Sequence, residues 1–311
     1  MRKPRSGDRG VRSPLRETGA RLEEVRVAAR TDPASLRRRI GAQLRHARTE
    51  AGRTTNEAAE ELGCSRGKIS QMEAGMYRLQ HRDVRDLLKF YGVAQAELNP
   101  LVEQAKRSAE PSWWAPYADV VEDWFAFFLG SEGEALREFN YEQLVVPGLL
   151  QTQDYAAALT SASRSVAAHD REKVAALRLE RQQRLTDSDP LALHVVIEES
   201  VLRRPIGGRD VLLAQLRHLA TMAALPHVDV QVMPTGVGAH SGMDGKFVLL
   251  EFEDFSPGVF LESHPVLGAR YDVEDPKLAE TYASIAKALR DEALDQRQST
   301  ELIESVIVDL V

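Results

Sequence analysis

Residues 65–75 read SRGKISQMEAG and combine hydrogen-bonding side chains with two apolar ones at helical spacing. Ile69 and Met72 are three residues apart, which predicts the inner face of a short helix at about Ser65–Ala74. The residues on the outer face either form hydrogen bonds or lack a side chain: Arg66, Gly67, Ser70 and Gln71. Arginine can bond guanine with two hydrogen bonds, and glutamine can bond adenine. This face could therefore contact the edges of DNA bases, with Gly67 allowing the backbone to approach closely.

A helix that reads bases needs a second helix to hold it in the major groove. In a helix-turn-helix unit the first helix braces against the DNA backbone, and the N-terminal turns of the second point at the bases. Such a unit requires a small residue where the helices cross, a turn residue, and an apolar inner face. Ala59, Gly63 and the pair Ile69 and Met72 meet these three requirements in order. The sequence therefore predicts a helix-turn-helix unit here.

The ends of these helices are also marked in the sequence. Thr54 and Glu57 have the spacing of a capping box, which predicts the start of the first helix. Ser65 is a suitable N-cap for the second helix, and Gly75 is expected to end it. Apolar periodicity predicts further short helices on both sides, which gives a five-helix domain between about residues 34 and 106.

Three basic residues lie in or near the predicted reading helix: Arg53, Lys68 and Arg78. They are expected to meet DNA phosphates, which supplies affinity but little sequence selectivity.

Charge divides the chain into two parts of opposite sign. Residues 1–92 hold 21 Lys and Arg against 12 Asp and Glu, whereas the whole chain has a net charge of −7. A basic part joined to an acidic one indicates a polyanion-binding module attached to a part that avoids nucleic acid. The single cysteine, Cys64, fits a reducing compartment, and no apolar run is long enough to cross a membrane. We expect a cytoplasmic, nucleoid-associated protein without a membrane contact.

The second part of the chain has a different pattern. Helical patterns are predicted to continue to about Arg184, and strand-like runs follow, such as LALHVVIEE, VDVQVMP and KFVLLEFED. A long helix is predicted from Pro276 to about Gln296, and the final LIESVIVDLV fits either a last core strand or a tail that docks on a partner. The expected fold class is mainly α with α+β. A five-helix domain precedes a larger C-terminal α+β domain with helices first and then a small sheet with flanking helices.

The predicted organisation has four segments. They are a flexible basic arm at residues 1–33, the DNA-binding domain at 34–106, an aromatic-rich connector at 107–130, and a C-terminal regulatory or partner-binding domain at 131–311.

The stretch TTNEAAEELGCSRGKISQMEAG resembles the helix-turn-helix of the Xre and lambda-repressor family. By position, the resemblance implies that Arg66, Gly67 and Gln71 lie where this family contacts bases, and that Thr55 touches a phosphate. It also implies an internal ion pair between Arg48 and Glu73. Two departures, Gly67 at a reading position and Cys64 where Ser or Thr is common, bear on base specificity and not on the fold.

Motifs in the second part resemble the actinobacterial WhiJ-like regulators. They are WW at 113–114, SEGEALREFNYEQLVVPGLLQTQDYA at 131–156, RLERQQRL at 178–185 and QVMPTGVGAHSGMDGKF at 231–247. The resemblance implies a transcriptional regulator that works with a small partner protein, sometimes described as antitoxin-like.

Four residues after Pro147 and Gly148 are candidates for a partner or peptide groove: Gln151, Thr152, Gln153 and Tyr155. The alternative is that their amides and hydroxyls cap and pack a helix. A homodimer is expected, because a single module reads only a few base pairs and specific sites are usually twofold. Double-stranded DNA and a small protein encoded nearby are the other expected partners. An alternative function is an antitoxin-like adaptor that binds a small partner and contacts DNA for autoregulation.

A hydrolase-like centre is the rival class. It would gather scattered residues: His194, Glu198, Glu199, His240 and His264. They show no metal-ligand spacing on a helix, and neighbours in a strand point to opposite faces. We expect no catalytic residues, no metal and no cofactor.

Overall fold

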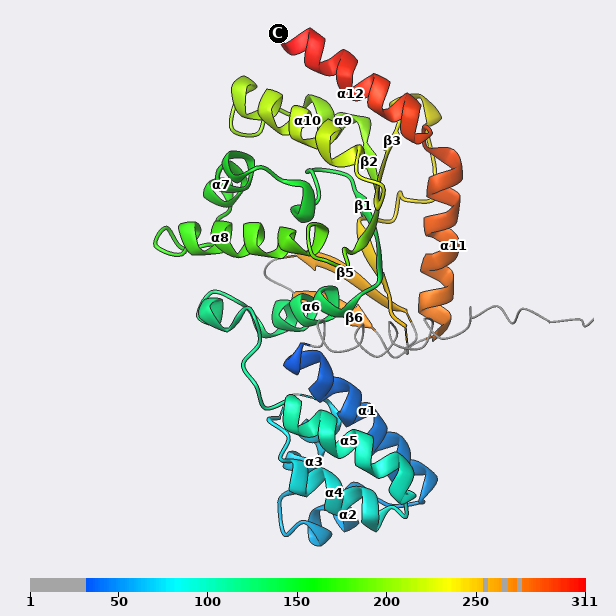
Figure 1. Cartoon of the computed structure of the whole chain (residues 1–311). Coiled ribbons are helices and arrows are strands. Elements are labelled where there is room, and N and C mark those ends of the chain that lie inside the picture. The colour runs from blue at the N-terminus through cyan, green and yellow to red at the C-terminus, as the bar shows by residue number, and fades with distance from the viewer. Residues whose placement is uncertain (1–31, 76, 254–256, 265–267, 273–275) are drawn as a thin grey trace, which may run out of the picture. The chain divides into compact units, whose positions relative to one another are not determined.

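The computed structural model describes residues 32–75, 77–253, 257–264, 268–272 and 276–311 (Figure 1). Within this range, residues 32–311 form one compact unit. The predicted basic arm lies outside the described residues up to Thr31, so the structure does not test it.

The first helices enclose a core of their own. They are α1 (Pro33–Glu50), α2 (Thr55–Glu61), α3 (Arg66–Glu73), α4 (His81–Phe90) and α5 (Gln95–Arg107). Among the described residues, this core comprises side chains between Ile40 and Ala105, with Leu44, Ile69 and Met72 fully buried. Apolar side chains at helical spacing on each helix meet there, which is the physical reason for five short helices.

The predicted helix ends are present. The Thr54 side chain accepts a hydrogen bond from the Glu57 backbone while the Glu57 carboxylate accepts one from the Thr54 backbone, so a capping box opens α2. Ser65 caps α3, accepting from the Lys68 backbone. Gly63 and Gly75 have φ angles of 62° and 70°, a backbone conformation that glycine adopts without strain and that ends a helix.

A six-stranded sheet forms the centre of the second part, in the order β3-β2-β1-β4-β5-β6. The strands are β1 (Arg137–Glu142), β2 (Ala192–Glu198), β3 (Val228–Met233), β4 (Phe247–Glu251), β5 (Gly258–His264) and β6 (Gly268–Asp272). Strands β1, β2 and β3 are parallel, and β4, β5 and β6 pair antiparallel.

Helices connect and cover these strands. They are α6 (Asp123–Glu134), α7 (Gln153–Ala162), α8 (Arg171–Arg181), α9 (Glu199–Arg203), α10 (Arg209–Ala223), α11 (Pro276–Glu292) and α12 (Gln296–Leu310). Short 3₁₀ turns lie at residues 115–117, 148–150, 182–185 and 235–237. Figure 1 shows α11 on one face of the sheet and α7, α8 and α10 on the other. Each face has its own apolar core.

The expected fold class is confirmed: an N-terminal helical domain is followed by an α+β domain. Two details differ from the sequence prediction. Strand β1 lies inside the region expected to be helical up to Arg184, and it is the partner of both β2 and β4. The final LIESVIVDLV is part of helix α12, which Asp295 opens with a capping box, so the strand alternative is wrong. In the described part of the chain, no helix is both long enough and apolar enough to span a membrane.

Candidate nucleic-acid interface

Helix α3 presents the predicted reading face to solvent. Arg66, Gly67, Ser70 and Gln71 are all exposed, whereas Ile69 and Met72 are fully buried. Ser65 accepts a hydrogen bond of 3.2 Å from the Lys68 backbone N–H, so it satisfies one of the free donors at the helix start. The face that could meet bases and the face that holds the helix are therefore cleanly separated.

Helix α3 rests on α1 with almost no space between the backbones. A Cβ added to Gly41 of α1 would lie 2.5 Å from the Met72 carbonyl oxygen and 2.7 Å from that of Glu73. At the end of α3, a Cβ added to Gly75 would lie 2.4 Å from Cγ of Arg38. All three distances are shorter than the contacts that Cβ atoms make in real proteins. The position of the reading helix is thus fixed by backbone contact with α1.

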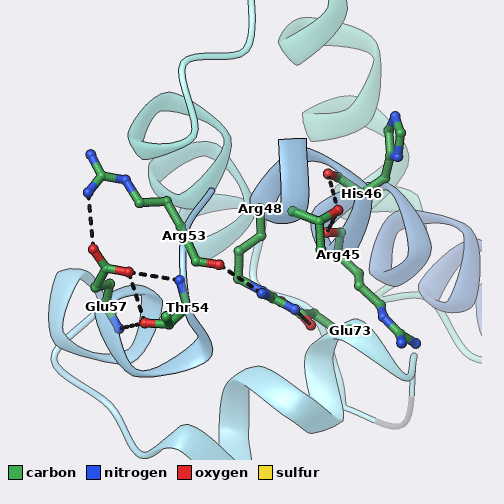
Figure 2. A network of polar contacts seen from close by, with 8 residues as sticks. Arg45, His46, Arg48, Arg53, Thr54, Glu57 and Glu73 are labelled. Atoms are coloured by element: carbon green, nitrogen blue, oxygen red, sulfur yellow. Dashed lines mark hydrogen bonds and ion pairs between the residues drawn. The ribbon is translucent and has the colours of Figure 1, made fainter. Parts of the chain in front are cut away.

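An ion pair fixes the same helix from another side (Figure 2). Arg48 Nε lies 2.6 Å from Glu73 Oε1, and Arg48 Nη2 donates to Glu73 Oε2 at 3.0 Å. The guanidinium also donates to the Arg53 carbonyl at 2.9 Å. The hydrogen bond to Glu73 raises the pKa of Arg48, since it favours the charged form. This pair, implied by the family resemblance, joins α1, the turn before α2, and the end of α3.

The predicted phosphate-binding cations already have partners in the free protein. Lys68 Nζ lies 2.7 Å from Asp83 Oδ2 on α4, and this bond raises the pKa of Lys68. Arg53 pairs with Glu57 at 3.1 Å and lies 4.7 Å from the centroid of the Phe90 ring.

Arg78 donates to the Ala109 carbonyl at 3.2 Å. Thr55 is half-buried at the first position of α2. Arg53 is more exposed than Lys68, with 42% of its side chain accessible against 27%. Because Lys68 pairs with Asp83, it must either bind both groups at once or break this ion pair to contact a phosphate.

The predicted partner-binding residues have contacts inside the C-terminal domain. Gln151 is buried and donates to the Val146 carbonyl at 2.7 Å, and Tyr155 is fully buried with its hydroxyl accepting from the Val146 N–H. Thr152 caps α7. Gln153 is the exposed member of the four. These contacts match the capping and packing alternative better than a groove lining.

The residues of the rival hydrolase class do not come together as a set. His240 Nε2 lies 3.2 Å from Glu198 Oε1, which also accepts from the Tyr141 hydroxyl at 2.6 Å. His194 lies elsewhere, 3.3 Å from Asp229.

Of the other members of that set, Glu199 pairs with Arg203 at 3.4 Å, and the side chain of His264 falls outside the described residues. Among the described residues, no group of three or more His, Cys, Asp or Glu is placed to hold a metal. Cys64 is half-buried in the turn, with its thiol 3.6 Å from the Ser65 carbonyl.

Sequence reasoning missed three residues of this interface: Gly41, Arg38 and Asp83. Gly41 had a signal, because a glycine within a helical pattern often marks a close backbone approach. Arg38 and Asp83 had none, since both look like ordinary charged positions on a helix surface.

Comparison with known families agrees with this division of the chain. A family model described as a helix-turn-helix domain matches residues 39–101. Another, described as a domain of unknown function (DUF5753), matches residues 125–305, which is more than half of the chain. No curated protein and no solved structure matches. The chain therefore belongs to the DUF5753 family, and it carries a helix-turn-helix domain on the N-terminal side of that family's domain.

Proposed function

We propose that this protein is a sequence-specific regulator of transcription that reads the major groove with the exposed face of α3. Two features of α3 together carry the proposal. Its polar face, including Arg66 and Gln71, is exposed. The helix is also held firmly, by close packing at Gly41 and Gly75 and by the Arg48–Glu73 ion pair. A reading helix must be held firmly, because hydrogen bonds to base edges depend on its position.

Each interface residue has a role in this proposal. Arg66 and Gln71 bond bases, Gly67 brings the backbone close to them, and Ser70 adds a hydroxyl on the same face. Thr55, Arg53, Arg78 and Lys68 contact phosphates. Residues 34–106 bind DNA, 107–130 connect, and 131–311 respond to a signal or a small protein partner.

The resemblance of its sequence motifs to two regulator families supports a finer assignment. The helix-turn-helix is of the Xre type, and the C-terminal domain is of the WhiJ-like kind. The protein works in the cytoplasm on the nucleoid as a homodimer, since two copies on a twofold site double the number of bases read. Segment 112–130 or the C-terminal domain supplies the dimer interface.

Binding selection from a random pool of DNA duplexes, followed by affinity measurements on the enriched sequence, tests this proposal. Arg66→Ala and Gln71→Ala should each weaken binding to that sequence by about 5- to 150-fold, the value of one bidentate base contact. Binding to unrelated duplexes should change little and stay salt-sensitive.

Two substitutions far from the reading face serve as matched controls: Arg297→Ala on α12 and the exposed Gln183→Ala. Both should keep full selectivity. If the selection enriches no sequence, or if the α3 variants bind the enriched sequence as tightly as the parent protein, the proposal is wrong.

A further inference from the structure

Helix α1 contacts two elements with different roles. On one side its backbone lies against the end of the proposed reading helix, at Gly41 and at Arg38 beside Gly75. Neither place has room for a Cβ. A shift of this part of α1 therefore moves the end of α3, because closely packed backbones move together.

On its other side the same stretch of α1 contacts α6, the helix that opens the DUF5753 match. The Arg38 guanidinium carbon lies 3.4 Å from the centroid of the Phe127 ring. The next residue of α1, Arg39, pairs through Nη2 with Glu134 Oε2 at 3.0 Å, and the Ser35 hydroxyl donates to the same carboxylate. The Glu134 side chain is only 4% exposed, so this ion pair is largely shielded from water.

The helices also approach closely at a glycine. A Cβ added to Gly130 of α6 would lie 3.0 Å from Asp32 Oδ1 and 3.5 Å from the Ser35 backbone nitrogen. Shielded ion pairs and close backbone contacts tolerate little sliding, so the α1–α6 contact is specific in its geometry.

We propose that Arg38 is a positioning residue through which the DUF5753 domain determines how the reading helix α3 is held against α1. Its backbone and the first part of its aliphatic stem lie against Gly75 at the end of α3, and its guanidinium lies on Phe127 of α6. One side chain thus touches both the element that reads and the domain that regulates. A partner or signal that displaces α6 would change DNA selectivity through Arg38. This regulation rests on the proposed reading role of α3.

Hydrogen exchange of the full chain without DNA tests the mechanical link by itself. The reporters are the Ala74 and Gly75 amides, which close the end of α3 by donating to the Ser70 and Met72 carbonyls. Phe127→Leu alters α6 and no atom of the helix-turn-helix core. It should speed exchange at both reporters by about three- to tenfold, the size of one cation–π contact. Arg38→Met keeps the stem on Gly75, removes the guanidinium, and should have the same effect.

Phe125→Leu is the matched control. Phe125 is also a half-buried phenylalanine of α6, and its ring contacts Phe128 and Arg181 within the C-terminal domain. This variant should leave the α3 reporters unchanged. Equal acceleration in Phe125→Leu and Phe127→Leu would mean general loosening of α6 and would overturn the proposal, as would no acceleration in Arg38→Met. If the Phe127→Leu protein unfolds, the exchange rates of Arg38→Met and Phe125→Leu are compared instead. Faster exchange in Arg38→Met alone supports the proposal, and equal rates overturn it.

DNA binding then tests the regulatory consequence. Arg38→Met and Phe127→Leu should each reduce the ratio of selective to non-selective affinity by about three- to tenfold. The double variant should lose no more than either single one, because both remove the same contact. Additive losses would overturn the proposal. If the parent protein binds no sequence selectively, the proposed function fails, while the exchange experiment still reports whether α6 is linked to α3.

Discussion

At the scale of single residues, two glycines in neighbouring helices have opposite roles. Gly41 is required by space, because any side chain there meets the α3 backbone at 2.5 Å. Gly67 has an ordinary helical backbone and open surroundings. A Cβ added to it would lie 3.8 Å from the Ser65 hydroxyl oxygen, its nearest neighbour. Gly67 therefore costs helix stability without a packing reason, which fits a residue kept for contact with DNA.

The two glycines give opposite predictions for one substitution. Gly67→Ala should raise the free energy of unfolding by about 0.5–1 kcal/mol, because alanine loses less backbone entropy in a helix. Gly41→Ala should lower it by about 1–3 kcal/mol, through overpacking against a backbone that cannot move aside. Chemical denaturation of both variants measures these changes. A stabilised Gly41→Ala protein would contradict the close packing of α3 against α1 at Gly41.

At the scale of elements, strand β1 places polar side chains inside the protein. Glu138, Asn140 and Glu142 alternate along β1 and are all buried. Asn140 donates to Glu138 at 3.0 Å, and the second Glu138 oxygen has no hydrogen-bond partner among the described residues. Nearby, Arg181 forms a buried bidentate ion pair with Glu132. Burial, with the Glu132 charge adding to it, raises the pKa of Glu138 to about 8.

This raised pKa predicts how stability depends on pH. The folded protein holds the Glu138 proton more tightly than the unfolded chain, whose reference value is 4.5. The contribution of Glu138 to stability is therefore fully present below about pH 4.5 and is lost as the pH rises through about 8. The Glu138→Gln protein should have a melting temperature close to that of the parent protein at pH 5. At pH 8.5 its melting temperature should be higher, by about 2–4 °C for each kcal/mol gained in the free energy of unfolding.

Thermal unfolding at the two pH values measures this difference. An equal shift at both pH values would show that packing, and not ionisation, dominates at Glu138.

At the scale of the whole molecule, charge and core are divided in the same way. In the described part of the chain, the helix-turn-helix core lies within residues 40–105, and the basic excess lies within residues 1–92. The rest of the chain is strongly acidic, which reduces the attraction of the whole protein to DNA at low salt. In the proposed function, the acidic part would lower non-selective binding, while the exposed face of α3 would supply selectivity.

A fragment of residues 32–110 tests this division. Because its core is complete, it should unfold cooperatively on heating, as followed by circular dichroism. It should bind unrelated duplexes more tightly than the full chain at low salt, and the difference should shrink as salt screens the acidic part. Weaker binding by the folded fragment would contradict this role of the acidic part.

The sequence by itself determined the local features of this protein. Capping at Thr54 and Ser65, glycine turns at Gly63 and Gly75, and apolar spacing at Ile69 and Met72 depend on neighbours within a few residues, so the helix-turn-helix and the fold class were predictable. Strand β1 was not, because its buried face carries Glu138 and Glu142, and only pairing with β2 and β4 makes it a strand.

The tertiary structure alone decided which distant residues meet. It placed Arg38 between Gly75 and Phe127, gave Lys68 the partner Asp83, and turned Gln151 and Tyr155 into the interior. Contacts between residues far apart in sequence depend on how whole helices pack, and no local pattern of charge or hydrophobicity records that packing.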